Sequence, residues 1–269
     1  MNFIILYKKH ILLFIFAMYI LFAACFIFIN LKENTSCSSN YIIDVSADDN
    51  SSFSDLQTKI DSIYSSKEKI AFLTFDDGPT KIATPKVLDI LKENNINASF
   101  FVIGYRVKEF PNIVKRAYEE GNFIANHGYS HKNSKLYKNR DSFINEILDT
   151  DKAISDAIEV SNYHSHVFRF PNGSKGGHSS SVKANCKTYL NDIGYCYVDW
   201  NALNNDSIKK YSSAQLLANL KKTCKNKNSL IVLMHDTSDV SKSYTALDAS
   251  IKYLKEEGYN FKTFDSILN

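Results

Sequence analysis

Residues 70–79 read Ile-Ala-Phe-Leu-Thr-Phe-Asp-Asp-Gly-Pro, an apolar run that ends in two adjacent carboxylates and a Gly-Pro pair. Residues 70–75 carry apolar side chains on both faces of an extended chain, as expected for a strand buried inside a parallel sheet. The change from apolar to acidic residues marks the end of that strand. The sequence therefore predicts a parallel sheet, with Asp76 and Asp77 at the carboxyl end of one strand.

Strand-like runs and amphipathic helical patterns alternate from this strand to the C-terminus. Further strands are predicted at 98–103, 123–126, 167–170, 195–198, 230–234 and 260–264. Helices are predicted from a Thr84 cap before Pro85, over 111–120, from an Asp141 cap to 158, and over 180–192, 213–225 and 244–257. The alternation indicates an α/β fold, a distorted (β/α) barrel of about seven strands, whose chemistry lies at the carboxyl ends of the strands.

The N-terminal region has a different texture. Residues 11–29 form a run of nineteen without a charge or a strongly polar group, which as a helix spans roughly 28 Å, close to the thickness of a bilayer core. Because Lys8 and Lys9 precede this run, residues 1–10 are expected in the cytoplasm and the remainder outside. The alternatives are a cleaved signal peptide and a lipoprotein with lipid on Cys25. A single-pass transmembrane anchor at 11–29 is the prediction.

Residues 30–69 resemble a stalk. They contain ten Ser and seven acids against four Lys, with no long apolar period, which is typical of a poorly packed spacer. Leu56, Ile60 and Ile63 stand at helical spacing, so one short helix is expected over 55–64. The catalytic domain is then predicted to occupy 70–269.

Charge and composition exclude several functions. The chain has 32 basic and 29 acidic residues, a net charge of +3, and only four of the basic residues are Arg. This balance gives no support for a nucleic-acid partner. The sequence also lacks the Gly-rich loop that a phosphate-binding protein would need. Cys186, Cys196 and Cys224 match no zinc knuckle or Cys-x-x-Cys motif, so buried free thiols are predicted.

Chemistry-bearing residues follow two of the predicted strands. Asp76 and Asp77 can divide labour, since one carboxylate can bind a metal while its neighbour accepts a proton; the alternative is a turn with solvated acids. His127 and His131, four residues apart, would share one face of a helical turn and hold one cation, unless they are merely two exposed histidines. One Asp with two His leaves coordination positions open for water and substrate, as a catalytic metal requires.

Three further strand ends carry distinctive residues. Arg169 ends the fourth strand, Asp199 and Trp200 the fifth, and Leu233 and His235 the sixth. Each has an ordinary alternative: a surface ion pair for Arg169, a core position for Trp200, and a buried, hydrogen-bonded imidazole for His235. Five such elements in succession at strand ends favour a shared active site.

These segments, in this order, resemble the signatures of the polysaccharide deacetylase family, the NodB-homology carbohydrate esterases. The matching residues are Thr-Phe-Asp-Asp-Gly at 74–78, the His127 and His131 pair, Arg-x-Pro-x-Gly at 169–173, Asp199-Trp200, and Leu233-x-His235. The resemblance spans 70–264. Gly128 departs from the Ser or Thr that members often carry, and Asn172 from a frequent Tyr.

The resemblance implies a metal-dependent mechanism. Asp77, His127 and His131 would hold a divalent metal, zinc first, with Co²⁺ or Mn²⁺ as alternatives. Asp76 would be the general base that takes a proton from water, and His235 the general acid that protonates the departing amine.

The resemblance also implies roles around this centre. Arg169 would orient Asp76 or Asp199, and Asp199 would tune the basicity of His235. The backbone N–H of Asn172 would stabilise the oxyanion. Trp200 and Leu233 would wall a small pocket for the acetate methyl group.

The substrate is inferred from location. A catalytic domain outside a membrane meets the cell wall first, so de-N-acetylation of peptidoglycan N-acetylglucosamine is the leading hypothesis, with no protein partner implied. The family alternatives are N-acetylmuramic acid, chitin oligomers and exported poly-N-acetylglucosamine. A catalytically silent wall-binding module is the alternative from another class, although binding alone would not require the base, the acid and the arginine.

Overall fold

The computed structural model describes residues 49–175, 180–237 and 243–268. Their strands form one parallel sheet in the order β5-β4-β3-β2-β1-β7-β6, with β8 paired to β1 off this path. Among the described residues no ladder joins β5 to β6, so the sheet is a barrel left open between these two strands. The α/β fold and the parallel sheet are confirmed.

The strands are β1 (Ile70–Asp76), β2 (Ser99–Val102), β3 (Phe123–Asn126), β4 (Val167–Phe168), β5 (Cys196–Tyr197), β6 (Ala202–Leu203), β7 (Ser229–His235) and β8 (Asn260–Phe261). The helices are α2 (Asp49–Ile63), α3 (Ala83–Glu93), α4 (Gly104–Glu109), α5 (Pro111–Glu119), α6 (Asn133–Leu136), α7 (Arg140–Ile158), α8 (Ser180–Asp192), α9 (Ser213–Cys224), α10 (Tyr244–Glu256) and α11 (Asp265–Leu268). The sequence analysis did not predict β6, because a strand of two residues is too short to show an alternating pattern.

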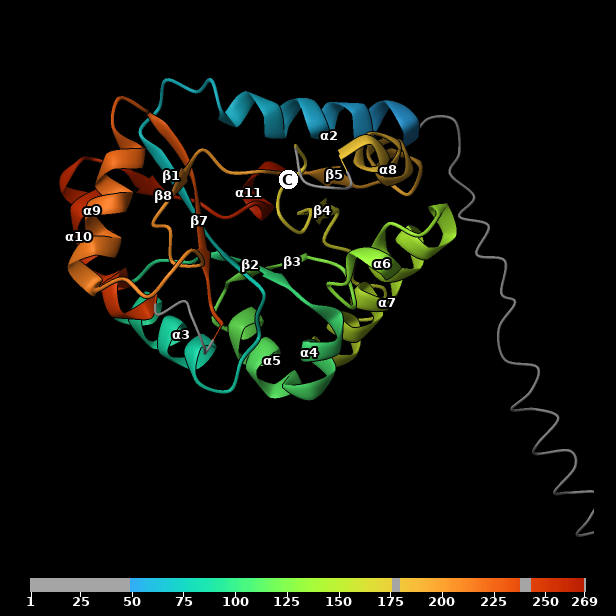
Figure 1. The fold of residues 1–269 in the computed structure, drawn as a ribbon, viewed down its shortest axis with the longest axis horizontal. Helices are drawn as coiled ribbons and strands as arrows, with labels where there is room; N and C mark the ends of the chain where they lie inside the picture. Colours follow the sequence, from blue (N-terminus) through green and yellow to red (C-terminus); the bar gives the residue numbers. More distant parts are fainter. Residues whose placement is uncertain (1–48, 176–179, 238–242, 269) are drawn as a thin grey trace, which may run out of the picture. The chain divides into compact units, whose positions relative to one another are not determined.

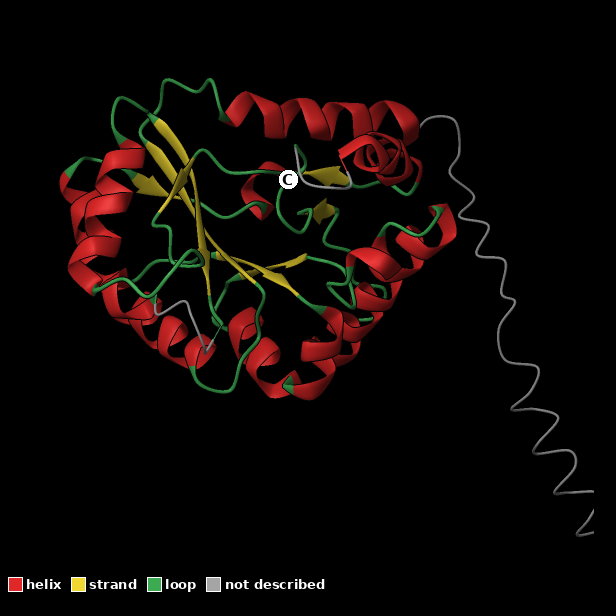
Figure 2. Ribbon diagram, in the orientation of Figure 1, coloured by secondary structure: helices red, strands yellow, loops and turns green. Residues whose placement is uncertain are grey.

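Strand β1 separates two apolar cores, as its unbroken apolar run predicted. Ala71, Leu73 and Phe75 point to an outer core, where α3, α4, α5, α7, α9 and α10 cover the sheet (Figures 1 and 2). Ile70 and Phe72 point to an inner core, in which the Phe72 ring stacks on Phe264 with centroids 5.0 Å apart. The inner face continues along the strand to Thr74 and Asp76 because strand residues alternate between faces.

Helix α2 corrects the predicted stalk boundary. Leu56, Ile60 and Ile63 are buried in the inner core, and Ile60 has no exposed surface. The Gln57 side-chain amide pairs with both the N–H and the carbonyl of Tyr197, so α2 caps the free edge of β5 (Figure 1). The folded domain therefore includes this helix as well as the residues from 70 onward, because its apolar stripe packs into the inner core.

The remaining N-terminal predictions fall on residues 1–48, outside the described part. No helix within the described residues is long and apolar enough to cross a membrane. Cys186, Cys196 and Cys224 are buried and free of disulfides, as predicted.

Two predicted helix caps are wrong. Asn139, not Asp141, caps α7, since its side chain accepts the Ser142 N–H at 2.8 Å. Thr84 lies inside α3, and its hydroxyl donates to the buried carboxylate of Asp236 at 2.5 Å. Tertiary hydrogen bonding has replaced local capping at this position.

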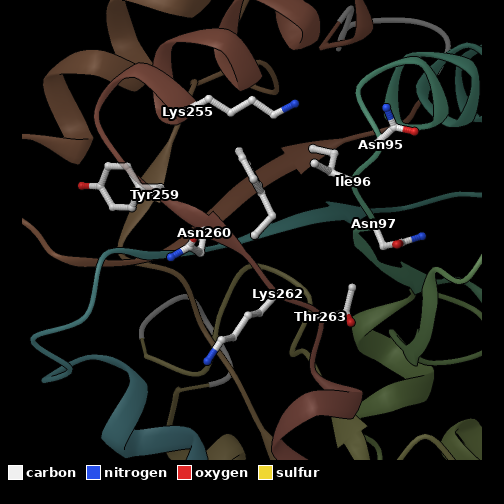
Figure 3. A pocket seen from close by; sticks show the side chains of 9 residues that line it. Asn95, Ile96, Asn97, Lys255, Tyr259, Asn260, Lys262 and Thr263 are labelled. Carbon is white, nitrogen blue, oxygen red and sulfur yellow. The ribbon is translucent and has the colours of Figure 1, made fainter.

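A cleft opens at the amino-terminal edge of the sheet. It is lined by residues that precede β2 and flank β8, among them Asn95, Ile96, Asn260 and Lys262 (Figure 3). Because chemistry in such sheets lies at the carboxyl ends of the strands, this cleft is separate from the predicted site.

Candidate active site and metal centre

Asp77, His127 and His131 converge in loops that follow β1 and β3. The sequence analysis expected the histidine pair on a helical turn, and this expectation is wrong. Gly128 and His131 have φ values of 83° and 54°, so the segment is an irregular loop that turns both rings to one point. Asp77 is also left-handed, with φ 74°, which is uncommon for a residue with a side chain and is often found at functional sites.

The three side chains fit a metal ion. Asp77 Oδ1 lies 3.1 Å from His131 Nε2 and 3.4 Å from His127 Nε2, and the three ligand atoms lie within 4.8 Å of one another. His127 Nδ1 lies 2.7 Å from the carbonyl of Arg169, which holds the tautomer that leaves Nε2 free to ligate. Two imidazoles and one carboxylate are a donor set for zinc and similar ions, with positions left for water and substrate.

The electrostatics of Asp77 agree with a ligand role. Burial opposes its ionisation, but hydrogen bonds and charges from His127 and His131 lower the pKa of Asp77 well below its ordinary value. The carboxylate is thus anionic and ready for a cation.

Glu146 supports the histidine loop and was missed by the sequence analysis. This buried residue of α7 accepts the N–H of Ser130 at 2.6 Å, and Asn126 Oδ1 accepts the N–H of Gly128 at 2.9 Å. A Cβ at Gly128 would lie 3.6 Å from the Glu146 carboxylate. The sequence did offer one sign of this burial, because Glu146 directly precedes Ile147, which belongs to the apolar stripe of the helix.

The guanidinium of Arg169 binds the carboxylate of Asp76. The arginine has no exposed surface, and its Nη1 donates to Asp76 Oδ1 at 2.8 Å and to Thr74 Oγ1 at 2.6 Å. Its Nη2 reaches the Asp199 carbonyl at 3.3 Å, and its guanidinium lies 4.0 Å from the centre of the Phe101 ring. The geometry selects Asp76 as the carboxylate that Arg169 orients, while Asp199 is contacted only through its main chain.

His235 is paired with Asp206, which corrects the expected role of Asp199. Asp206 Oδ1 lies 2.7 Å from His235 Nδ1. The Asp199 carboxylate instead accepts the N–H of Ser174 at 2.8 Å and its hydroxyl at 2.7 Å. The chain turns away after β5 and returns through β6 beside β7, so the later aspartate, not the earlier one, reaches the imidazole.

The surroundings of His235 favour its protonated form. Burial disfavours its imidazolium, but the hydrogen bond and charge of Asp206, with the charges of Asp76 and Asp77, raise the pKa of His235 to about 9. His235 is the register partner of Asp76 across the β1–β7 ladder. The candidate proton donor and the carboxylate held by Arg169 therefore stand on neighbouring strands.

The three predicted substrate-contacting residues lie around this centre. Asn172 is exposed in the loop after β4, with φ 62°. The ring of Trp200 lies beside the same loop, 3.2 Å from where a Cβ of Gly173 would be. Leu233 shares the inner face of β7 with His235, two residues away.

A parallel sheet with an Asp-His-His cluster, an Arg-held carboxylate and an Asp-held histidine at its carboxyl edge has the features of a hydrolase built on an open α/β barrel. Residues 64–198 match the family model described as polysaccharide deacetylase. The chain belongs to the polysaccharide deacetylase family and is an enzyme of that family.

Known relatives agree with this assignment. The chain is 34% identical over 206 residues to a peptidoglycan-N-acetylglucosamine deacetylase of Bacillus cereus, covering 74% of this chain and 70% of that protein. It is 31% identical over 219 residues to a peptidoglycan-N-acetylmuramic acid deacetylase of Bacillus subtilis, covering 78% and 76%. A CE4 esterase of Streptococcus mutans superposes with a TM-score of 0.68 at 29% identity, covering 76% of this chain and 90% of that structure.

Proposed function

We propose that the protein removes acetyl groups from N-acetylglucosamine of peptidoglycan and depends on a divalent metal, zinc first. The observation that carries the proposal is the position of Asp76. It is held by Arg169 at 2.8 Å, adjoins the ligand Asp77, and faces His235 across the ladder. A module that only bound the wall would have no use for this pairing of base and acid.

Asp77, His127 and His131 would hold the metal. When bound there, the ion polarises the acetamide carbonyl and lowers the pKa of a water molecule. The ring of His127 is fixed for this task by its Nδ1 contact with the Arg169 carbonyl.

Asp76 takes the proton from the attacking water. Its Oδ1 is occupied by Arg169, whereas Oδ2 lies on the side of His127, 3.9 Å from Nε2. Oδ2 is therefore the oxygen that accepts the proton, and Arg169 keeps the carboxylate from rotating away.

His235 gives a proton to the amine as the C–N bond breaks. With a pKa raised to about 9, it carries that proton at neutral pH. The N–H of Asn172 donates to the oxyanion, while Trp200 and Leu233 wall the space for the acetate methyl. The products are acetate and a free amino sugar.

The choice of substrate and of location go together. We propose that residues 11–29 anchor the protein in the cell membrane and place the catalytic domain on the outer side, facing the wall. The relatives named as acting on N-acetylglucosamine and N-acetylmuramic acid keep both peptidoglycan sugars as candidates. The proposed anchor favours peptidoglycan as the polymer because the wall is the first polysaccharide that the domain meets.

Purified peptidoglycan treated with the full-length, zinc-loaded protein tests the proposal. Acetate release and mass spectrometry of the muropeptides should show loss of acetyl from glucosamine, and the matched Asp76→Asn protein should show none. Loss from muramic acid alone would reassign the sugar. Release from chitin oligomers or poly-N-acetylglucosamine but not from peptidoglycan would reassign the polymer, and release from no glycan would favour a binding module.

Fractionation of cells tests the location. The protein should sediment with membranes, and its domain should be digested by protease added from outside. A mature form that starts near residue 30 in the medium would contradict the anchor, and a form that starts at a lipidated Cys25 would identify a lipoprotein.

A further inference from the structure

Lys183 is a buried cation that the proposed mechanism leaves without a role. It lies in the first half of α8, outside every motif of the family resemblance, and only 2% of it is exposed. Burial lowers the pKa of Lys183, and the nearby charge of Asp199 opposes this effect. A buried ammonium needs firm partners, because an unpaired one is costly to desolvate.

Two of its partners are the carbonyls on either side of Asn172. Lys183 Nζ donates to the carbonyl of Pro171 at 3.1 Å and to that of Gly173 at 2.7 Å. It thus grips the loop whose central residue carries the proposed oxyanion donor. Asn172 and Gly173 are both left-handed, with φ of 62° and 79°, a pair of conformations that needs external support.

The geometry of the peptide unit links Lys183 to the N–H of Asn172. The Pro171 carbonyl and the Asn172 N–H belong to one planar trans peptide, in which C=O and N–H point in opposite directions. Because the carbonyl is turned toward Lys183, the N–H is turned away from it. A cation on the carbonyl also polarises the peptide and makes the N–H a stronger donor.

The end of the loop is fixed independently. The Asp199 carboxylate holds Ser174 through its N–H and its hydroxyl, and the Tyr64 hydroxyl accepts the Asp199 N–H at 3.1 Å. These contacts locate Ser174, and the Gly173 N–H donates to the Phe170 carbonyl at 2.8 Å, which closes a turn with Pro171 and Asn172 at its centre. A turn of this kind can hold its central peptide in either of two orientations. The contact of Lys183 Nζ with the Pro171 carbonyl favours the orientation in which that carbonyl faces α8.

We propose that Lys183 is a positioning residue for the oxyanion-stabilising N–H of Asn172, orienting and polarising the Pro171–Asn172 peptide through its carbonyl. This inference rests on the proposed function of Asn172. Lys183 of α8 would thus help to stabilise the transition state without contributing to substrate binding.

Kinetics of Lys183→Met in the full-length protein test the inference. Since outright loss of one oxyanion donor costs about 10²–10³ in rate, misorientation of the N–H should lower kcat roughly 10- to 100-fold with KM nearly unchanged. Lys187→Met is the matched control, because Lys187 lies one turn further along α8 and covers the Tyr197 ring instead. Lys183→Arg, which keeps a cationic donor, should recover most of kcat.

Either of two kinetic results would overturn the inference. One is an unchanged kcat in folded Lys183→Met, and the other is a rise in KM alone. Should Lys183→Met fail to fold, Lys183→Gln keeps a shorter, uncharged donor and should still lower kcat; wild-type kcat in that variant would overturn the inference equally.

Amide hydrogen exchange gives a readout that does not depend on activity. Peptides covering 170–174 should exchange faster in Lys183→Met, while peptides from β1 and β7 and the whole of Lys187→Met match the wild type. Wild-type exchange of 170–174 in Lys183→Met would refute the proposed grip. Absence of acetate release from the wild-type protein would instead contradict the proposed function, and the exchange result would still decide whether Lys183 holds the loop.

Discussion

Asp206 binds His235 at two points: its Oδ1 lies 2.7 Å from Nδ1 of the ring, and its Oδ2 accepts the backbone N–H of the same residue at 2.7 Å. The Ser243 hydroxyl also donates to Oδ2. One buried carboxylate therefore fixes the place, the ring orientation and the charge of the proposed acid. Nε2 of His235 is left to face the site.

Asp206→Asn should move the basic limb of the pH–rate profile to lower pH. The folded pKa of His235 is raised to about 9, so its acid form is present at neutral pH and is lost as the pH rises through that value. Replacing the anion with an amide lowers this pKa, and the acid form is lost earlier. The measurement is kcat against pH, with Asp199→Asn as the comparison, because the Asp199 carboxylate holds Ser174 instead. A shift in Asp199→Asn but not in Asp206→Asn would reverse the pairing.

Asp76→Asn and Asp77→Asn should separate catalysis from metal binding. Asp77→Asn replaces an anionic ligand with a neutral amide and should lose metal. Asp76→Asn should retain metal, yet lose about 10²–10⁴ in kcat with its base. Metal content measured beside kcat distinguishes them. If Asp76→Asn lost the metal and Asp77→Asn kept both metal and activity, the two roles would be exchanged.

Gly78→Ala should destabilise the loop that follows β1 and carries Asp77. A Cβ at this position would collide with both carboxylate oxygens of Asp236, which is buried, held by Thr84, and has an Oδ1 without a hydrogen-bond partner among the described residues. Overpacking of this kind costs roughly 1–3 kcal/mol. Urea unfolding measures the loss, and metal affinity should fall with it. The double variant with Asp236→Ala should cost less than the sum of the two single variants, since the clash is then removed; strict additivity would contradict this contact.

Ile60→Ala should show that α2 belongs to the domain. Ile60 is fully buried against the inner core, and truncation of a buried isoleucine costs about 2–5 kcal/mol. Chemical denaturation of the full-length protein measures it. Lys59→Ala, on the exposed side of the same helix, should leave the unfolding midpoint unchanged. Equal unfolding midpoints for the two variants would contradict the assignment of α2 to the folded domain.

The sequence alone was sufficient wherever function lies next to a strong local pattern. Asp76 ends and Asp77 directly follows a strand that its unbroken apolar run predicted. β3 matches its predicted bounds, so His127 directly follows a strand as well. Because parallel strands end at one edge of the sheet, their terminal residues had to meet there. The cluster of Asp77, His127 and His131 and the nearness of Asp76 to His235 could therefore be predicted without coordinates.

Only the tertiary structure decided which side chains pair. Asp199 and Asp206 are both acids after β5, and nothing local distinguishes them; the return of the chain through β6 brings Asp206 to His235. The apolar stripe of α2 predicted a helix but not its packing into the inner core. The surrounding segment is rich in Ser and acidic residues, which indicated a solvated spacer instead. Glu146 and Lys183 likewise look like ordinary charged helix residues until the fold buries them against loop backbone. Hydrogen bonds between segments distant in sequence depend on the path of the whole chain, and a local pattern contains no information about that path.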